Sequence, residues 1–264
     1  MWEGEALPPG PVADRPATTQ PGAVCTVLIL RRPGDPWPLL LAANRDERLA
    51  RAADPPGPWW PAHPGLIGGH DRSGGGSWMA LGPRGVVAAV LNRPGSLGPA
   101  PGKASRGDLP LLAAAAASAA EAAGRLAALD AGAYRSFNAV VADTAGAFFI
   151  AGLGEGHPAV TALAEGLSMV TSAGPNDRSN PRIARHLPRF AAAPPPRPPD
   201  WATWPLLLND AGGAPDAQLH VSPRDGFGTV SSSLLALGAK GERLWRFRET
   251  GRPWRDIPLP PSQP

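Results

Sequence analysis

The stretch "CTVLILRRPGDPWPLLLAANRDE", residues 25–47, contains the features on which the fold prediction depends. An apolar run at 26–30 is followed by a turn rich in Pro and Gly and by a second apolar run at 38–43, a pattern typical of a β-hairpin. Both runs are apolar at nearly every position, as in strands that are buried on both faces. The stretch therefore predicts an antiparallel strand pair inside a layered core.

Further strand pairs are expected along the chain, which gives about ten strands in total. Their apolar runs lie at 77–82 with 85–92, at 136–143 with 147–153, at 159–172 with a turn at Glu165 and Gly166, and at 227–238 with 242–249. Because short turns join neighbouring strands, the sheets are predicted to be antiparallel.

Helices are expected in three places. The alanine-rich segment 109–130 is predicted to form one long helix, with Asp108 as its cap, because Ala is the strongest helix former. Shorter helices are expected over 181–191 and 201–210. Together with the strands, these segments predict an α+β fold in which two antiparallel sheets stack face to face with helices outside.

The composition excludes several classes of protein. The net charge is only +3, and no basic run is interleaved with aromatic residues, so no nucleic-acid partner is expected. No stretch approaches 18 apolar residues, which excludes a predicted membrane span. A single cysteine and the lack of a signal-peptide pattern favour a cytoplasmic location. The abundance of Ala, Pro, Gly and Arg suggests a bacterial genome rich in GC.

Four polar residues, Asn44 to Glu47, end the second strand of the hairpin. A hairpin of this length places residues 42–47 beside the start of the first strand, where Cys25 stands. The quartet is either a solvated strand end whose ion pair adds little stability, or a set of polar groups delivered to Cys25. Cys25 is either a small buried core residue or a nucleophile, since one thiol forms neither an internal disulfide nor a cysteine-based metal site.

These segments resemble the NRDE family, which is named for its Asn-Arg-Asp-Glu quartet and includes the eukaryotic transport-and-Golgi-organisation proteins. The agreement extends to "GGGSWMAL", "GVVAAVLN", "SRGDL" at 105–109 and "FNAVVAD" at 137–143, and it spans about 25–250. The resemblance implies a four-layer αββα sandwich of the N-terminal-nucleophile (Ntn) hydrolase type, distantly akin to penicillin acylases and bile salt hydrolases. One domain is therefore expected over 25–250, followed by a Pro-rich tail at 251–264.

The resemblance also implies a mechanism for a hydrolase that cleaves the C–N bond of a small-molecule amide. In that group the nucleophilic cysteine is the first residue of the mature chain, so its free α-amine takes the thiol proton. Asp46 aligns with the acid that orients the amine, and Asn92 aligns with the oxyanion-hole Asn. Arg45 would lower the pKa of the thiol or contact the substrate. The remaining motif positions are Asn44, Glu47, Ser105, Arg106, Asn138 and Ser172, the last with Asn176 close by.

This mechanism requires Cys25 to become the first residue. Residues 1–24 contain many prolines and show no apolar period, so they are expected to be a disordered leader or the product of a mis-annotated start. Initiation at Val24 would give Met-Cys, because a GTG start codon reads as valine when it is internal.

Three positions depart from the hydrolases. Ala43 stands in place of an active-site Arg, Ser172 in place of a later Asn, and Val230 in place of the Arg of the family's "YGTR". A non-catalytic protein on the same fold, which binds and traffics haem or an acyl-CoA or related lipid metabolite, is therefore the alternative. A small-molecule partner is expected in either case, and haem is a cofactor only under the alternative.

Two other features carry less specific signals. The five histidines, which are His63, His70, His157, His186 and His220, show no metal-ligand spacing, so no metal site is expected. Under the haem-binding alternative any one of them is a candidate axial ligand, and the sequence does not select which. The glycine-rich segment 68–78 matches no phosphate- or dinucleotide-binding fingerprint. It is expected to be a loop that passes close to the site, with Trp78 covering the core.

Overall fold

The computed structural model describes residues 25–262, so the predictions made for residues 1–24 lie outside the described residues. Within this range thirteen strands form two antiparallel sheets. The first sheet has the order β10 (Gly166–Val170), β1 (Thr26–Arg31), β2 (Leu39–Arg48), β11 (Phe227–Leu237), β12 (Arg243–Glu249) and β13 (Arg255–Asp256). The second has the order β3 (Ala53–Gly57), β4 (Ile67–Asp71), β5 (Ser77–Leu81), β6 (Val87–Asn92), β7 (Phe137–Ala142), β8 (Ala147–Gly152) and β9 (Ala159–Ala162).

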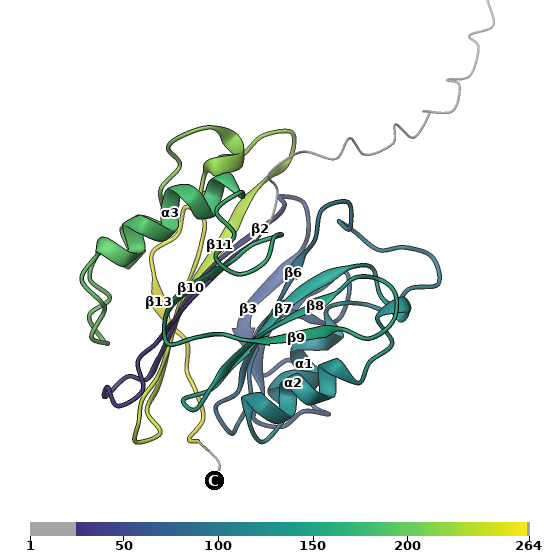
Figure 1. Cartoon of the computed structure of the whole chain (residues 1–264), viewed down its shortest axis with the longest axis horizontal. Helices are drawn as coiled ribbons and strands as arrows, with labels where there is room; N and C mark the ends of the chain where they lie inside the picture. Colours follow the sequence, from purple (N-terminus) through teal and green to yellow (C-terminus); the bar gives the residue numbers. More distant parts are fainter. Residues whose placement is uncertain (1–24, 263–264) are drawn as a thin grey trace, which may run out of the picture.

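Helices cover the outer faces of the two stacked sheets (Figure 1). The helices α1 (Asp108–Ala114) and α2 (Ala119–Ala127) pack on the second sheet, and α3 (Pro181–Ala192) and α4 (Trp204–Leu208) pack on the first. Two short 3-10 helices, η1 (Ala131–Ala133) and η2 (Pro215–Ala217), lie in the connections. The predicted α+β fold, a four-layer αββα sandwich, is confirmed.

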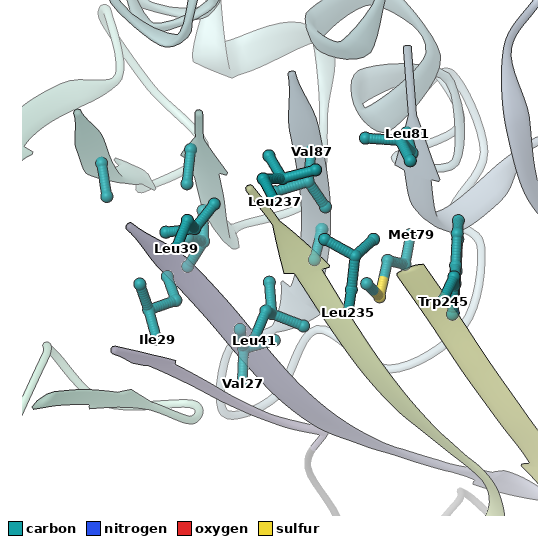
Figure 2. Close-up of a cluster of buried hydrophobic side chains, with 14 of the residues drawn as sticks. Val27, Ile29, Leu39, Leu41, Met79, Leu81, Val87, Leu235, Leu237 and Trp245 are labelled. Carbon is teal, nitrogen blue, oxygen red and sulfur yellow. The ribbon is translucent and has the colours of Figure 1, made fainter. Parts of the chain in front are cut away.

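The first hairpin shows why its strands are apolar throughout. Val27 and Ile29 pack between the two sheets, whereas Leu28 points the other way and packs beneath α3 and α4. Side chains of β2 alternate in the same manner, and Leu39 and Leu41 join the central layer. Figure 2 shows these inward-facing side chains meeting residues of the second sheet. Each fully buried side chain of this size contributes about 1.5–3 kcal/mol to the free energy of folding.

The alanine-rich segment forms two helices, so the prediction of one long helix over 109–130 is wrong. Ser118 has an extended backbone and caps α2, because its hydroxyl accepts a hydrogen bond from the N–H of Glu121 at 3.1 Å. The Glu121 carboxylate in turn accepts the N–H of Ala117 at 2.8 Å, which completes a capping arrangement that local alanine propensity does not override. Asp108 lies in the first turn of α1 rather than at its cap, which is Gly107.

The segment 159–172 does not form the strand pair that its sequence predicts. β9 pairs with β8 in the second sheet, whereas β10 pairs with β1 in the first. Leu163, in the connection, is buried between the sheets, so the chain crosses from one sheet to the other at this point.

The glycine-rich segment 68–78, predicted to be a loop, contributes to β4 and β5. A glycine stands at position 69 of β4 because the Trp78 ring fills the space where a side chain would lie. The ring comes to 2.1 Å from the position that a Cβ would take. Glycine inside a strand often marks such a close approach.

Residues 251–262 follow the edge of the first sheet. β13 pairs with β12, and Ile257 is buried in the central layer. The Arg243 guanidinium donates to the carbonyl of Pro260. None of the described helices is both long and apolar enough to cross a membrane.

Candidate functional site

The Asn-Arg-Asp-Glu quartet lies at the end of β2, where its side chains alternate between the two faces of the first sheet. Arg45 and Glu47 face the space between the sheets, whereas Asn44 and Asp46 face the outer helices. Thr26 pairs with Asn44, so Cys25 stands beside Arg45 at the start of β1, as the hairpin length predicts. The quartet is therefore divided between two environments.

A cleft of about 300 Å³ opens at this end of the sandwich. Cys25, Arg45 and Glu47 line it from the first sheet, and Trp78 and Asn92 line it from the second. The loop that carries "SRGDL" forms its outer wall, with the residues Gly98, Pro99, Ala100, Lys103, Ala104, Ser105, Arg106 and Gly107. Behind Cys25 a gap of about 10 Å³ continues between the sheets, which is room for about one water molecule.

Cys25 is a half-buried residue that lines this cleft. Its Sγ donates to the backbone carbonyl of Asp46 at 3.7 Å. Burial raises the pKa of the Cys25 thiol to about 12, and the carboxylate of Asp46 adds to this rise whereas Arg45 opposes it. A thiol in this environment is protonated at neutral pH, so nucleophilic attack requires a nearby proton acceptor.

Arg45 is held against the second sheet. Its guanidinium lies 4.0 Å from the centroid of the Trp78 ring and 3.9 Å from the Asp71 carboxylate. The side chain is buried, and this burial lowers the pKa of Arg45 from its usual value. The cation–π contact fixes a positive charge at the wall of the cleft next to the thiol.

Asp46 lies on the opposite face of the strand, buried beneath α3. Its Oδ2 accepts from Nη1 of Arg182 at 2.9 Å, and its Oδ1 accepts from Oγ1 of Thr229 at 2.6 Å. The same Nη1 of Arg182 donates to Oγ1 of Thr26 at 3.0 Å. Burial raises the pKa of Asp46, whereas Arg182 and Thr229 oppose that rise. This network fixes the strand ends on which both Cys25 and its carbonyl acceptor lie.

Asn44 also serves the outer layer. Its Nδ2 donates to the carbonyls of Leu208 and Leu219 at 2.8 and 2.9 Å, and its Oδ1 accepts from Oγ of Ser232 at 2.7 Å. These three bonds join β2 to β11 and to the segments around α4. The amide of Asn44 is thus directed away from the cleft.

Asn138 links the two sheets. Its Nδ2 donates to the carbonyls of Thr171 and Ala173 at 2.8 and 3.0 Å, and its Oδ1 accepts from Nη1 of Arg93 at 2.7 Å. Ser172 lies between these two carbonyls, in the segment that follows β10. Neither Asn138 nor Ser172 lines the cleft.

The structure brings together six of the ten residues that the sequence singles out. The six that line the cleft are Cys25, Arg45, Glu47, Asn92, Ser105 and Arg106. The side chains of Asn44, Asp46 and Asn138 instead hold the surrounding elements in place, and Ser172 lies in a segment that Asn138 ties down.

Several residues of the site are missed by the sequence analysis. Arg182 is one of them, although it shares the buried face of α3 with Ile183, His186, Leu187 and Phe190, a helical spacing that could have identified it. Asp71 and Arg51, which pair at 2.7 Å, and Lys103 and Arg135 also line the cleft. These four side chains have no sequence signal, because they come from separate loops and strand ends.

The histidines do not converge on the cleft. None of the five lines it, and the described part of the chain contains no group of three or more His, Cys, Asp or Glu residues that could hold a metal ion. Among the described residues, Cys25 is therefore the one cysteine or histidine that lines the cleft.

Comparisons with known proteins add a family and a structural neighbour. The family model described as "Transport and Golgi organisation 2" matches residues 24–193. No curated protein matches the sequence. A similar solved structure is the crystal structure of a mutant conjugated bile acid hydrolase from Clostridium perfringens, with a TM-score of 0.53 and 11% identity over 88% of this chain and 92% of that chain. At this identity the likeness shows the fold alone, which is the Ntn-hydrolase sandwich.

Proposed function

The chain belongs to the Transport and Golgi organisation 2 family, and on that premise we propose that it is a hydrolase that cleaves small-molecule amides with Cys25 as nucleophile. The observation that carries the proposal is the position of this thiol. Cys25 holds the only sulfhydryl of the chain, and this half-buried residue lines a cleft of about 300 Å³. Arg45 and Asn92 line the same cleft, so a cation and an amide donor accompany the thiol.

The protonation state of Cys25 defines what the active form requires. With its pKa raised to about 12, the Cys25 thiol is protonated at pH 7, so a base must lie next to the sulfur. A free α-amine on Cys25 itself would have a pKa of about 8 and would meet this requirement. The active form in this proposal is therefore a chain whose first residue is Cys25.

The reaction then proceeds in two halves. The α-amine takes the thiol proton, and the thiolate attacks the amide carbonyl with the negative charge passing to its oxygen. The side-chain amide of Asn92 is the proposed donor to that oxygen, a role worth about 3 kcal/mol in known hydrolases. The C–N bond breaks as the protonated α-amine returns its proton to the leaving nitrogen, and water hydrolyses the resulting thioester.

The roles of the two flanking charged residues differ. Arg45 stabilises the thiolate through its charge at the cleft wall. Asp46 is a positioning residue in this proposal, since its side chain joins Arg182 and Thr229 and its carbonyl accepts the thiol. The lone thiol also favours a reaction in the cytoplasm, where cysteines stay reduced.

The test begins with the protein produced from its own upstream DNA. Its intact mass and N-terminal sequence are expected to show a chain that starts at Cys25, which hydrolyses members of a panel of N-acyl amides. Cys25→Ala and Cys25→Ser should abolish turnover, whereas Arg84→Gln, in the exposed turn between β5 and β6, should not change it. A chain that starts at Cys25 and cleaves no amide would rule the hydrolase out.

A second candidate function is the binding and trafficking of haem or of an acyl-CoA or related lipid metabolite without catalysis. The observation that favours it is that both carboxylate oxygens of Asp46 already accept hydrogen bonds, one from Arg182 and the other from Thr229. Addition of haemin would then produce a Soret band, and Cys25→Ala would test the candidate axial thiolate. For haem, loss of that band in Cys25→Ala together with no amide turnover would support the carrier. For an acyl-CoA, which needs no thiol ligand, equal binding to Cys25→Ala together with no amide turnover would do so.

A further inference from the structure

Positive charges outnumber negative charges among the side chains that line the cleft. Five of them are cations and two are carboxylates. The carboxylates, Glu47 and Asp71, share Arg51, which lies 3.7 Å from the first and 2.7 Å from the second, and Asp71 also lies 3.9 Å from Arg45. Charge on this side of the cleft is therefore compensated within the protein.

The loop side of the cleft carries positive charge alone. Lys103, Arg106 and Arg135 line it, and within residues 25–262 none of the three lies within 4.0 Å of a carboxylate. Uncompensated cations in a concave site raise the local concentration of anions and attract negatively charged ligands.

Arg106 is fixed by neutral acceptors. Its Nη1 donates to Oγ of Ser96 at 2.8 Å and to the carbonyl of Ser136 at 3.1 Å, and its Nη2 donates to the carbonyl of Gly98 at 3.1 Å. A guanidinium has five N–H donors, so two of them find no acceptor within the described residues. These bonds orient the Arg106 guanidinium without neutralising its charge, and they leave two of its N–H donors for a ligand.

Arg135 is held by the same loop. Its Nη1 donates to the carbonyls of Leu97 and Pro99 at 2.9 and 3.2 Å, and its Nη2 donates to the carbonyl of Gly95.

Burial, together with the nearby charges of Arg135 and Arg51, lowers the pKa of Arg106 to about 10. Arg106 stays protonated at neutral pH, and its charge and that of Arg135 repel each other, so an anion placed between them would relieve that repulsion.

We propose that Lys103, Arg106 and Arg135 bind the anionic end, a carboxylate or a phosphate, of a small molecule whose other end reaches Cys25. The planar fork of an arginine matches both groups with paired N–H···O bonds. The assignment of the far end to a scissile amide rests on the proposed hydrolase function, whereas the anion site itself does not.

The single cysteine makes a direct test possible. Iodoacetate and iodoacetamide are alike in size and differ by one negative charge, and Cys25 is the only thiol that either can alkylate. The ratio of the two rates is expected to exceed the ratio for the uncharged N-acetylcysteine amide by about tenfold at low salt and to fall as salt is added. Because both reagents attack the same thiolate, the pKa of Cys25 cancels from this ratio.

Variants then locate the effect. Arg106→Gln, Arg135→Gln and Lys103→Gln should each lower the ratio by about threefold, as the loss of one nearby charge predicts, whereas Arg84→Gln should leave it unchanged. Since Lys103 is exposed, its variant keeps the test valid if an arginine variant fails to fold. A ratio equal to that of N-acetylcysteine amide, or one that no variant changes, overturns the proposal.

A binding measurement covers the case in which Cys25 does not react with either reagent. Calorimetric titrations of the full chain with inorganic phosphate, N-acetylglycine and the neutral N-acetylglycinamide should show binding of at least one of the two anions, weakened in Arg106→Gln. Binding of phosphate alone or of N-acetylglycine alone identifies the anionic group. Equal binding of the neutral amide, or of no probe, overturns the anion site. Anion binding by a chain that starts at Cys25 and cleaves no amide would instead refute only the proposed hydrolase.

Discussion

Asp46 and Arg182 form an ion pair between β2 and α3, with Oδ2 and Nη1 2.9 Å apart and side chains 0% and 2% exposed. Removing one member of such a pair leaves a buried charge without its partner, which typically costs about 3–5 kcal/mol. Thr229 donates a hydrogen bond to Asp46, and Arg182 donates one to Thr26. The pair therefore joins four segments, which are β1, β2, β11 and α3.

We therefore expect Arg182→Met to lower the free energy of unfolding by about 3–5 kcal/mol, measured by urea denaturation of the full chain. The double variant Asp46→Asn with Arg182→Met should recover part of this loss, because no uncompensated charge then remains. Arg84→Gln, which removes an exposed arginine, serves as the control. A single variant as stable as the wild type would show that the pair contributes nothing to the fold.

His186 predicts a pH dependence of stability. Burial lowers the pKa of His186 to about 4, against the opposing effect of the hydrogen bond between its Nε2 and the carbonyl of Ala217. An unfolded chain protonates this histidine near pH 6.5, so between pH 6.5 and 4 it binds more protons than the folded chain. Stability is therefore full above pH 6.5 and falls as the pH drops toward 4.

The measurement compares urea denaturation of His186→Gln with that of the wild type at several values of pH. Glutamine offers an N–H for the Ala217 carbonyl and does not titrate, so the slope between pH 6.5 and 4 should become smaller. His157→Gln, at an exposed position, should keep the wild-type slope. Identical slopes in all three proteins would mean that His186 does not account for the dependence.

The contrast between Cys25 and Asp46 shows what the sequence could predict. A hairpin between two consecutive strands makes the approach of residues 42–47 to Cys25 a local matter, so spacing alone is enough to foresee it. The alternation of β2 also follows from sequence, yet it assigns Arg45 to the cleft and Asp46 to the other face. The partner of Asp46 on α3 is 136 residues away, and no local pattern specifies that contact.

The cationic side of the cleft was unpredictable for a related reason. Arg106 belongs to a recognisable motif, but Arg135 comes from a different connection, and the two meet only because loop carbonyls at Gly95 to Pro99 orient them. The net charge of the cleft depends on which carboxylates lie within reach of each cation, and only the assembled fold determines those distances.

Ser118 determines where the alanine-rich segment breaks. Its hydroxyl caps α2 through the N–H of Glu121, so Ser118→Ala should lower the free energy of unfolding by about 1 kcal/mol. Ser118→Asp retains a capping oxygen and should restore most of the lost stability, which thermal or urea denaturation can measure. If Ser118→Ala were as stable as the wild type, alanine propensity rather than the cap would control this region.

Arg45 controls the reactivity of Cys25. Its charge favours the thiolate of a cysteine whose pKa is otherwise raised by burial and by Asp46, so Arg45→Gln should slow iodoacetamide alkylation several-fold at pH 8. Arg45→Lys keeps a cation but loses the planar stacking on Trp78, and its rate should lie between the two. Arg84→Gln should react at the wild-type rate.

The pH profile of the same reaction separates two forms of the chain. Where residues precede Cys25, the alkylation rate should rise about tenfold per pH unit without levelling off below about pH 10, as a thiol pKa of about 12 requires. A chain that starts at Cys25 carries a charged α-amine beside the sulfur, which lowers the thiol pKa, so its profile should level off at a lower pH. If the two profiles coincided, the α-amine would have no influence on the sulfur and could not serve as its base.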